Sequence, residues 1–97
     1  MNTIYIEPQQ NKQVLRLVEA AVQGEVARLE LALELAKKRL APFEDKYHVS
    51  SEKFIATMAA EDLQGGDDEY VQWAGEYKLM QRLYEKLQQL KDLRFGN

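Results

Sequence analysis

A long proline-free run of helix-forming residues constrains this chain more than any other feature. Residues 9–41 contain no proline and a single glycine, Gly24, and the densest part reads LELALELAKK at residues 29–38. Leucine, alanine, glutamate and lysine are among the residues with the highest helix propensity. About 33 residues at ~1.5 Å each form a rod about 50 Å long. We therefore expect a long helix over residues 9–47, with a kink or break at Gly24 or at Pro42 as the alternative.

The first eight residues predict a short extended arm. Thr3-Ile4-Tyr5-Ile6 is a β-prone run, and Pro8 ends it. Because a lone strand is not stable in water, we expect this arm, residues 1–8, to lie across a helix or to pair with a strand of another chain.

Serine and glycine residues mark the remaining helices. Ser50 or Ser51 is expected to cap a short helix over residues 50–64. A Gly-Gly pair ends that segment, and the last helix is expected over residues 67–94, because its three leading carboxylates face the positive end of the helix dipole. The final three residues are expected to fray. Together these segments predict one all-α domain, residues 1–97, in which two long helices form an antiparallel hairpin with the short helix between them.

The first long helix carries apolar residues on two nearly opposite sides, as a rotation of ~100° per residue shows. The first stripe consists of Val14, Val18, Val22, Leu29, Leu33, Ala36 and Leu40. The second stripe consists of Leu17, Ala20, Gly24, Ala27, Leu31 and Leu35. The last helix can cover only one of them, and each exposed leucine forgoes about 1.5–3 kcal/mol of transfer free energy.

We therefore predict that the second stripe is a site of self-association, or of binding to a different chain. Its small residues allow another helix to approach closely, and an uncovered apolar stripe favours aggregation. The alternative is that the first helix folds back on itself at Gly24 and forms a self-sufficient bundle.

Composition and charge exclude several functional classes. The 97 residues include no cysteine, so neither a disulfide nor a thiolate metal site is possible. No run of about 18 apolar residues and no basic, apolar leader is present, so we expect no membrane insertion and a cytoplasmic location. Positive charge is not clustered, which argues against nucleic-acid binding. Residues 48–69 hold one basic and six acidic residues, and this segment suits a basic partner.

No residue pattern predicts catalysis or a cofactor. The single histidine, His48, lacks the orienting group and the oxyanion site that a Ser-His pair requires. The acidic cluster does not have the spacing of a calcium loop, and helix capping explains its last three members, so metal binding is only the alternative there. The cluster consists of Glu61, Asp62, Asp67, Asp68 and Glu69. We expect a protein without enzymatic activity.

The segment from Ser50 to Tyr77 resembles a family of short prokaryotic helical proteins that are similar to antitoxins. The likeness is carried by SSEKF at residues 50–54 and by EDLQGGDDEYVQWAGEY at residues 61–77. The resemblance implies that the chain neutralises a small toxin, typically an RNA-cleaving one, by direct binding. Many antitoxins also carry a DNA-binding module, but this chain has no helix-turn-helix candidate with a basic recognition helix.

These observations lead to a hypothesis about the two surfaces. The predicted partner surface consists of Asp67, Asp68, Tyr70, Trp73 and Tyr77. Its acidic side chains would take the place of phosphates in a basic groove of the toxin, while apolar contacts supply most of the affinity. The second stripe would serve self-association. The alternative function is a helical homo-oligomeric scaffold or adaptor.

Overall fold

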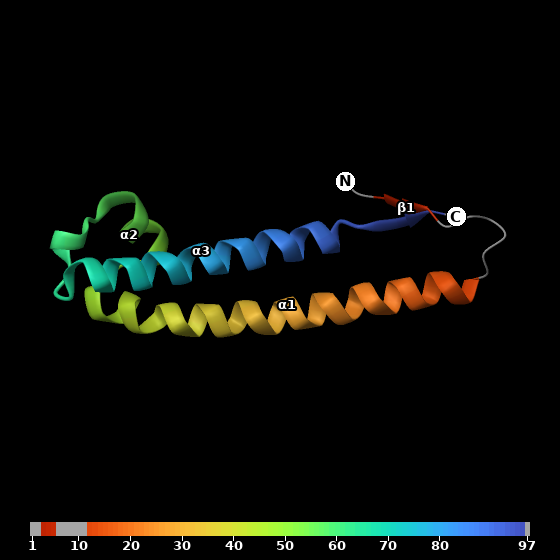
Figure 1. Ribbon diagram of the computed structural model, residues 1–97, viewed down its shortest axis with the longest axis horizontal. Coiled ribbons are helices and arrows are strands. Elements are labelled where there is room, and N and C mark those ends of the chain that lie inside the picture. Colours follow the sequence, from red (N-terminus) through yellow and green to blue (C-terminus); the bar gives the residue numbers. More distant parts are fainter. Residues whose placement is uncertain (1–2, 6–11, 97) are drawn as a thin grey trace.

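The computed structural model, which describes residues 3–5 and 12–96, is dominated by two long antiparallel helices (Figure 1). Its elements are, in chain order, β1 (Thr3–Tyr5), α1 (Lys12–Tyr47), α2 (Ser51–Thr57), the 3-10 helix η1 (Ala60–Asp62), α3 (Gly66–Lys91) and β2 (Arg94–Gly96). The molecule is a rod that measures 62 × 20 × 19 Å. The expected hairpin of two long helices with a short helix between them is confirmed.

Helix α1 is continuous through both residues at which a break was expected. Gly24 and Pro42 lie inside the 36-residue helix. Proline cannot donate a backbone hydrogen bond, yet the helix continues for five residues beyond Pro42. It continues because Phe43 and Tyr47, which follow the proline, pack against the core. The hypothesis that the first helix folds back on itself at Gly24 is therefore wrong.

Local capping determines where the next elements begin and end. His48 adopts a φ of 53° directly after α1, and the Val49 N–H donates to the Glu44 carbonyl at 3.3 Å, which closes the helix. Ser50, not Ser51, caps α2, because its Oγ accepts a hydrogen bond from the Lys53 N–H at 3.1 Å.

The segment expected as one helix over residues 50–64 is divided into α2 and η1. Met58 and Ala59 have extended backbones, with φ of −107° and −111°. The Asp62 carboxylate accepts a hydrogen bond from the Ala59 N–H at 2.8 Å, and this contact starts the 3-10 turn. The chain can therefore fold back beside α3 at the end of the hairpin (Figure 1).

The core follows the first stripe of α1 from Leu29 onward, whereas Val14 is exposed and Val18 and Val22 are half-buried. Leu29, Leu33, Ala36 and Leu40 are buried, as their spacing predicts, and Leu29 and Leu33 pack with Leu87 of α3. A second cluster, which we call the cap cluster, joins the end of α1 to α2 and α3. It consists of Leu40, Phe54, Leu63, Trp73, Ala74 and Tyr77. Helix α3 runs beside the C-terminal part of α1, and the N-terminal end of α1 extends past it (Figure 1).

The two ends of the chain form a small parallel sheet. Strand β1 pairs with β2, with Thr3 opposite Arg94, Ile4 opposite Phe95 and Tyr5 opposite Gly96. The arm is thus paired within the chain, its pairing with another chain stays a prediction, and Phe95 and Gly96, which were expected to fray, lie in β2. The remaining arm residues, the expected helix start at residues 9–11 and residue 97 lie outside the described residues.

Candidate functional site

The second stripe of α1 is exposed along its whole length. None of its six residues is buried, and the exposed fractions of Leu17, Leu31 and Leu35 are 64%, 63% and 46%. The stripe faces away from α3, because the buried leucines lie on the opposite side of the same helix. From the first to the last leucine it spans about 27 Å, at ~1.5 Å per residue. The chain therefore presents a continuous apolar stripe that its own described elements leave open.

The glycine at the centre of this stripe is not required by packing within the chain. No atom outside the local helix lies within 4 Å of the position that a Cβ on Gly24 would occupy. A glycine in a helix interior costs about 1 kcal/mol relative to alanine. The second stripe thus carries a local cost in stability that no contact among residues 3–5 and 12–96 explains.

Trp73 anchors the cap cluster and does not belong to a partner surface. Its indole is fully buried and stacks on Phe54, with ring centroids 3.8 Å apart and an angle of 1° between the rings. The Phe43 ring also stacks on Trp73, with ring centroids 5.4 Å apart. Tyr77 belongs to the same cluster and is only 9% exposed. The prediction that Trp73 and Tyr77 contact a partner is therefore corrected. Apolar residues cover a wide arc of α3, and α2 packs over the part of this arc that carries Trp73 and Tyr77. Both rings therefore point into the cap cluster.

A buried polar relay connects this cluster to α1. The Trp73 Nε1–H donates to the Ser51 Oγ at 2.8 Å, and the Ser51 hydroxyl donates to the Glu44 carboxylate at 2.7 Å. The Ser51 backbone N–H donates to the same carboxylate oxygen at 2.9 Å. No buried polar side-chain atom among the described residues lacks a partner, so the relay fixes the position of α2 and its serine hydroxyl is already bonded. Sequence analysis missed this relay, because a serine that caps a helix and a serine that is buried have the same signature.

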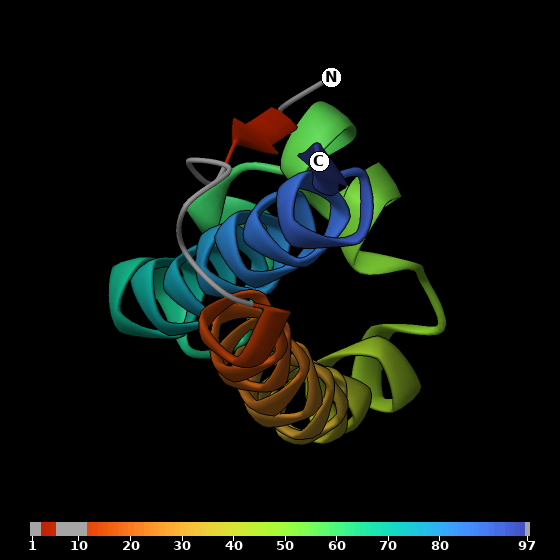
Figure 2. The ribbon, with the colours of Figure 1, turned by 90° about the vertical axis from the view of Figure 1, so that its right-hand side faces the viewer.

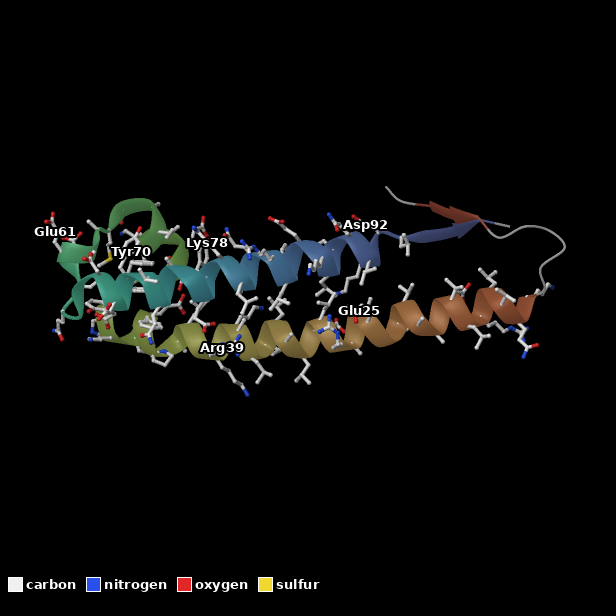
Figure 3. The ribbon with its side chains drawn as sticks, viewed as in Figure 1. Glu25, Arg39, Glu61, Tyr70, Lys78 and Asp92 are labelled. Atoms are coloured by element: carbon white, nitrogen blue, oxygen red, sulfur yellow. The ribbon has the colours of Figure 1, made fainter. Side chains whose placement is uncertain are left out.

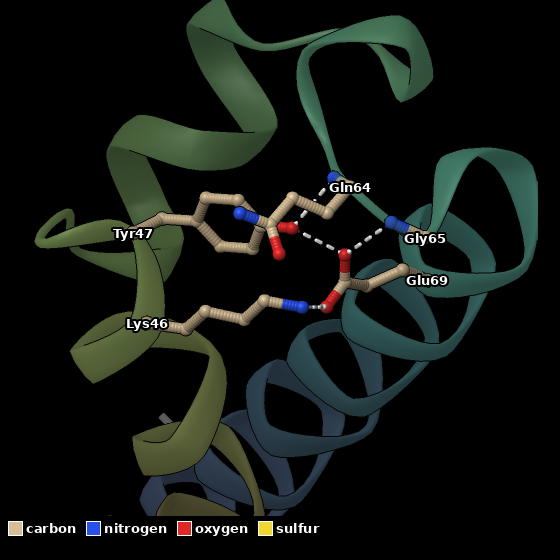
Figure 4. Close-up of polar contacts among 5 residues, drawn as sticks. All are labelled: Lys46, Tyr47, Gln64, Gly65 and Glu69. Carbon is tan, nitrogen blue, oxygen red and sulfur yellow. Dashed lines mark hydrogen bonds and ion pairs between the residues drawn. The ribbon is translucent and has the colours of Figure 1, made fainter.

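Glu69 is the centre of a second network, which joins α1 to the start of α3 (Figure 4). Its carboxylate accepts from the Lys46 Nζ at 2.8 Å, from the Tyr47 hydroxyl, and from the Gly65 N–H at 3.0 Å. The Tyr47 oxygen in turn accepts from the Gln64 N–H at 2.8 Å. The Lys46 ammonium first, and then the Tyr47 hydroxyl, lower the pKa of Glu69 to about 2. This member of the acidic cluster is therefore a structural residue.

Of the four remaining acidic residues, Asp62 binds the Ala59 N–H, and the other three form an exposed end of the rod, which we call the acidic end. It consists of Glu61, Asp67 and Asp68, and Figure 3 shows Glu61 at the extremity of the molecule. Tyr70 lies beside them and is half-buried, and the centroid of its ring is 5.1 Å from that of Phe54. Of the predicted partner surface, Asp67 and Asp68 are thus exposed and Tyr70 is partly so. The structure does not bring this end together with the second stripe.

One exposed apolar feature was not predicted. Val71 and Leu79, on the outer side of α3, are 68% and 40% exposed, with the helical Gly75 between them at intervals of four residues. The i, i+4, i+8 spacing of these three residues places them on one side of a helix, and the exposed feature could have been predicted from it. Gly75 was expected to form a notch for a partner side chain with Tyr70 and Trp73, and Val71 was overlooked because Trp73 and Tyr77 dominate the same stretch of sequence.

Metal-binding geometry is not found in the part of the chain that the structure describes. There, no group of three or more histidine, aspartate or glutamate side chains is placed to hold a metal ion. A pocket of about 260 Å³ lies beside α2, and its lining includes Ser51 and Glu44, which are already bonded to each other. Within the same residues, no helix combines the length and the apolarity needed to cross a membrane.

Comparison with known proteins adds no assignment to this geometry. No family model, curated protein or solved structure matches the chain. The second stripe and the acidic end are exposed features that the sequence predicted.

Proposed function

We propose that this chain is a non-catalytic, cytoplasmic protein-binding protein of the antitoxin type. The observation that carries the binding role is the second stripe, in which three large leucines remain exposed, whereas four residues of the first stripe, from Leu29 to Leu40, are buried. Contiguous exposed apolar surface on a folded protein marks an interaction site. Burying each of these leucines would gain about 1.5–3 kcal/mol in transfer free energy.

The acidic end supports a toxin as one of the binding partners. Residues 48–69 hold six acidic residues and one basic residue, and Asp67 and Asp68 are exposed there. A toxin that cleaves RNA needs a basic groove for phosphates, and carboxylates at the end of a narrow rod fit such a groove. The resemblance over residues 50–77 favours the same kind of partner. Neutralisation would be steric, because the rod occupies the groove that the substrate needs.

Co-expression tests this proposal. The small reading frame next to the gene is expressed alone and together with this chain, and growth is scored. We expect growth arrest by the neighbour alone and rescue by this chain. Charge reversal at Asp67→Lys and Asp68→Lys should abolish rescue. Glu85→Lys is the matched control, because Glu85 is exposed elsewhere on α3, and this change should leave the rescue intact. A neighbour that is harmless when expressed alone would contradict the antitoxin hypothesis.

The second candidate is a homo-oligomeric scaffold or adaptor. The small residues Ala20, Gly24 and Ala27 at the centre of the second stripe favour it, because they permit close packing of two helices. This candidate predicts an oligomer of fixed size and no effect of the chain on the toxicity of any neighbouring protein.

A further inference from the structure

We propose that the second stripe binds the second stripe of another copy of this chain, with the two α1 helices antiparallel and crossing at Gly24. This inference deepens the proposed protein-binding function by naming the occupant of the stripe. It does not depend on a toxin. Four features of the chain support it: the spacing of the stripe, the open glycine, the charges at the edges of the stripe and the acidic end of the rod.

The stripe is self-complementary about Gly24. Leu17 precedes Gly24 by seven residues and Leu31 follows it by seven, while Ala20 precedes it by four and Ala27 follows it by three. A twofold axis at Gly24 therefore places each Leu17 opposite a Leu31 and each Ala20 opposite an Ala27. In an isologous interface every contact occurs twice, so a sequence that is symmetric about one residue fits this arrangement.

Gly24 is the position at which two helices can come closest. It is exposed, and nothing outside its own helix lies within 4 Å of where its Cβ would be. Glycine is unfavourable in a helix interior, so a helix with no neighbour there would be served better by alanine. The distance between packed helices is set by the side chains at the contact, and glycine with flanking alanines gives the shortest one.

The charges beside the stripe favour the antiparallel orientation. Arg16 and Glu34 are exposed on the same edge of the stripe, eight residues before and ten residues after Gly24. Neither makes an ion pair with another described residue, whereas Arg28 and Arg39 are paired within the chain. The twofold axis brings the Arg16 side chain of each copy close to the Glu34 side chain of the other. Opposite charges at such a rim select orientation more than they add affinity.

The acidic ends favour the same orientation. The segment with six acidic residues and one basic residue lies at one end of the rod. A parallel dimer would place two such ends side by side, and their like charges would repel each other. The antiparallel dimer separates them to opposite ends. Helix α3 lies on the other side of α1, so it leaves the stripe accessible to a second rod (Figure 2).

Disulfide trapping tests the orientation, because the chain contains no cysteine. Ala20→Cys is mixed with an affinity-tagged Ala27→Cys chain and oxidised, and each variant is also oxidised alone. In the antiparallel arrangement the two Ala20 positions are about 12 Å apart along the axis, at ~1.5 Å per residue, which is beyond the ~7 Å that a disulfide spans. We expect the mixed disulfide as the main product. A dominant Ala20→Cys homodimer, or no cross-link at all, would overturn the proposal.

A pair of glycine substitutions provides the control. Gly24→Leu fills the crossing point and should abolish the mixed disulfide. Gly75→Leu makes the same change at an interior position of α3, where the site is equally open, and should leave the disulfide intact. Circular dichroism confirms that both variants remain helical. A disulfide that survives Gly24→Leu would refute the crossing point. A monomeric chain that still rescues growth would refute the dimer and leave the toxin-binding function standing.

Discussion

Removal of the Ser51 hydroxyl should destabilise the protein far more than removal of the hydroxyl of its neighbour Ser50. Ser51→Ala leaves the buried Trp73 N–H without an acceptor, which costs about 1–3 kcal/mol. It also removes the hydroxyl bond to the Glu44 carboxylate, and a bond to a charged group contributes about 1.5–3 kcal/mol. The backbone N–H of residue 51 still donates to Glu44, so we expect a total loss of about 3 kcal/mol.

Ser50→Ala is the matched control, because it removes only the cap of α2. A lost N-cap costs about 1 kcal/mol. Urea unfolding of both variants is followed by circular dichroism and by the fluorescence of the single tryptophan, at one protein concentration. We expect a larger loss of unfolding free energy for Ser51→Ala and an altered emission maximum only in that variant. Equal losses would show that the buried relay does not stabilise the cap cluster.

Three further predictions concern other parts of the rod. His48→Gly should stabilise the protein by about 1 kcal/mol, because glycine adopts a positive φ without the steric cost that histidine bears. Thermal unfolding should therefore give a higher melting temperature, and a lower one would contradict the prediction. Glu69 has a depressed pKa of about 2, so its contribution to stability should be complete above about pH 4.5 and should be lost as the pH falls toward 2. Glu69→Gln should remove this acid dependence, whereas Glu61→Gln should retain it. Leu33→Ala should lower the free energy of unfolding by about 2–5 kcal/mol and Leu31→Ala by much less, because only Leu33 is buried within the chain. Chemical unfolding at low protein concentration measures both losses. Comparable losses would argue against the assignment of the two stripes.

The division of α1 into a buried and an exposed side was predictable from spacing alone. Leu29 and Leu33 are buried while Leu31 and Leu35 are exposed, as helical periodicity requires for residues on opposite sides. Periodicity acts locally along one helix, so it does not depend on the positions of the other elements. For this reason the exposed stripe is the part of the candidate site that the sequence identified best.

The inward orientation of Trp73 and Tyr77 could not be derived in the same way. Apolar residues cover a wide arc of α3, and the arc does not show which of its edges α2 will cover. That choice depends on where the chain turns after Thr57, and the turn is stabilised by local contacts such as the hydrogen bond from the Ala59 N–H to the Asp62 carboxylate. The pairing of β1 with β2 has the same character, because it joins segments about 90 residues apart and is stabilised by backbone groups that every sequence possesses.

The mass of the protein in solution decides whether the exposed side of α1 is an interface between two copies. Multi-angle light scattering should give twice the chain mass of 11.3 kDa for the wild-type protein, and 11.3 kDa for a Leu17→Ser, Leu31→Ser variant that remains helical. A wild-type protein that stays at 11.3 kDa at every concentration, or a double variant that still dimerises, would contradict the proposed interface.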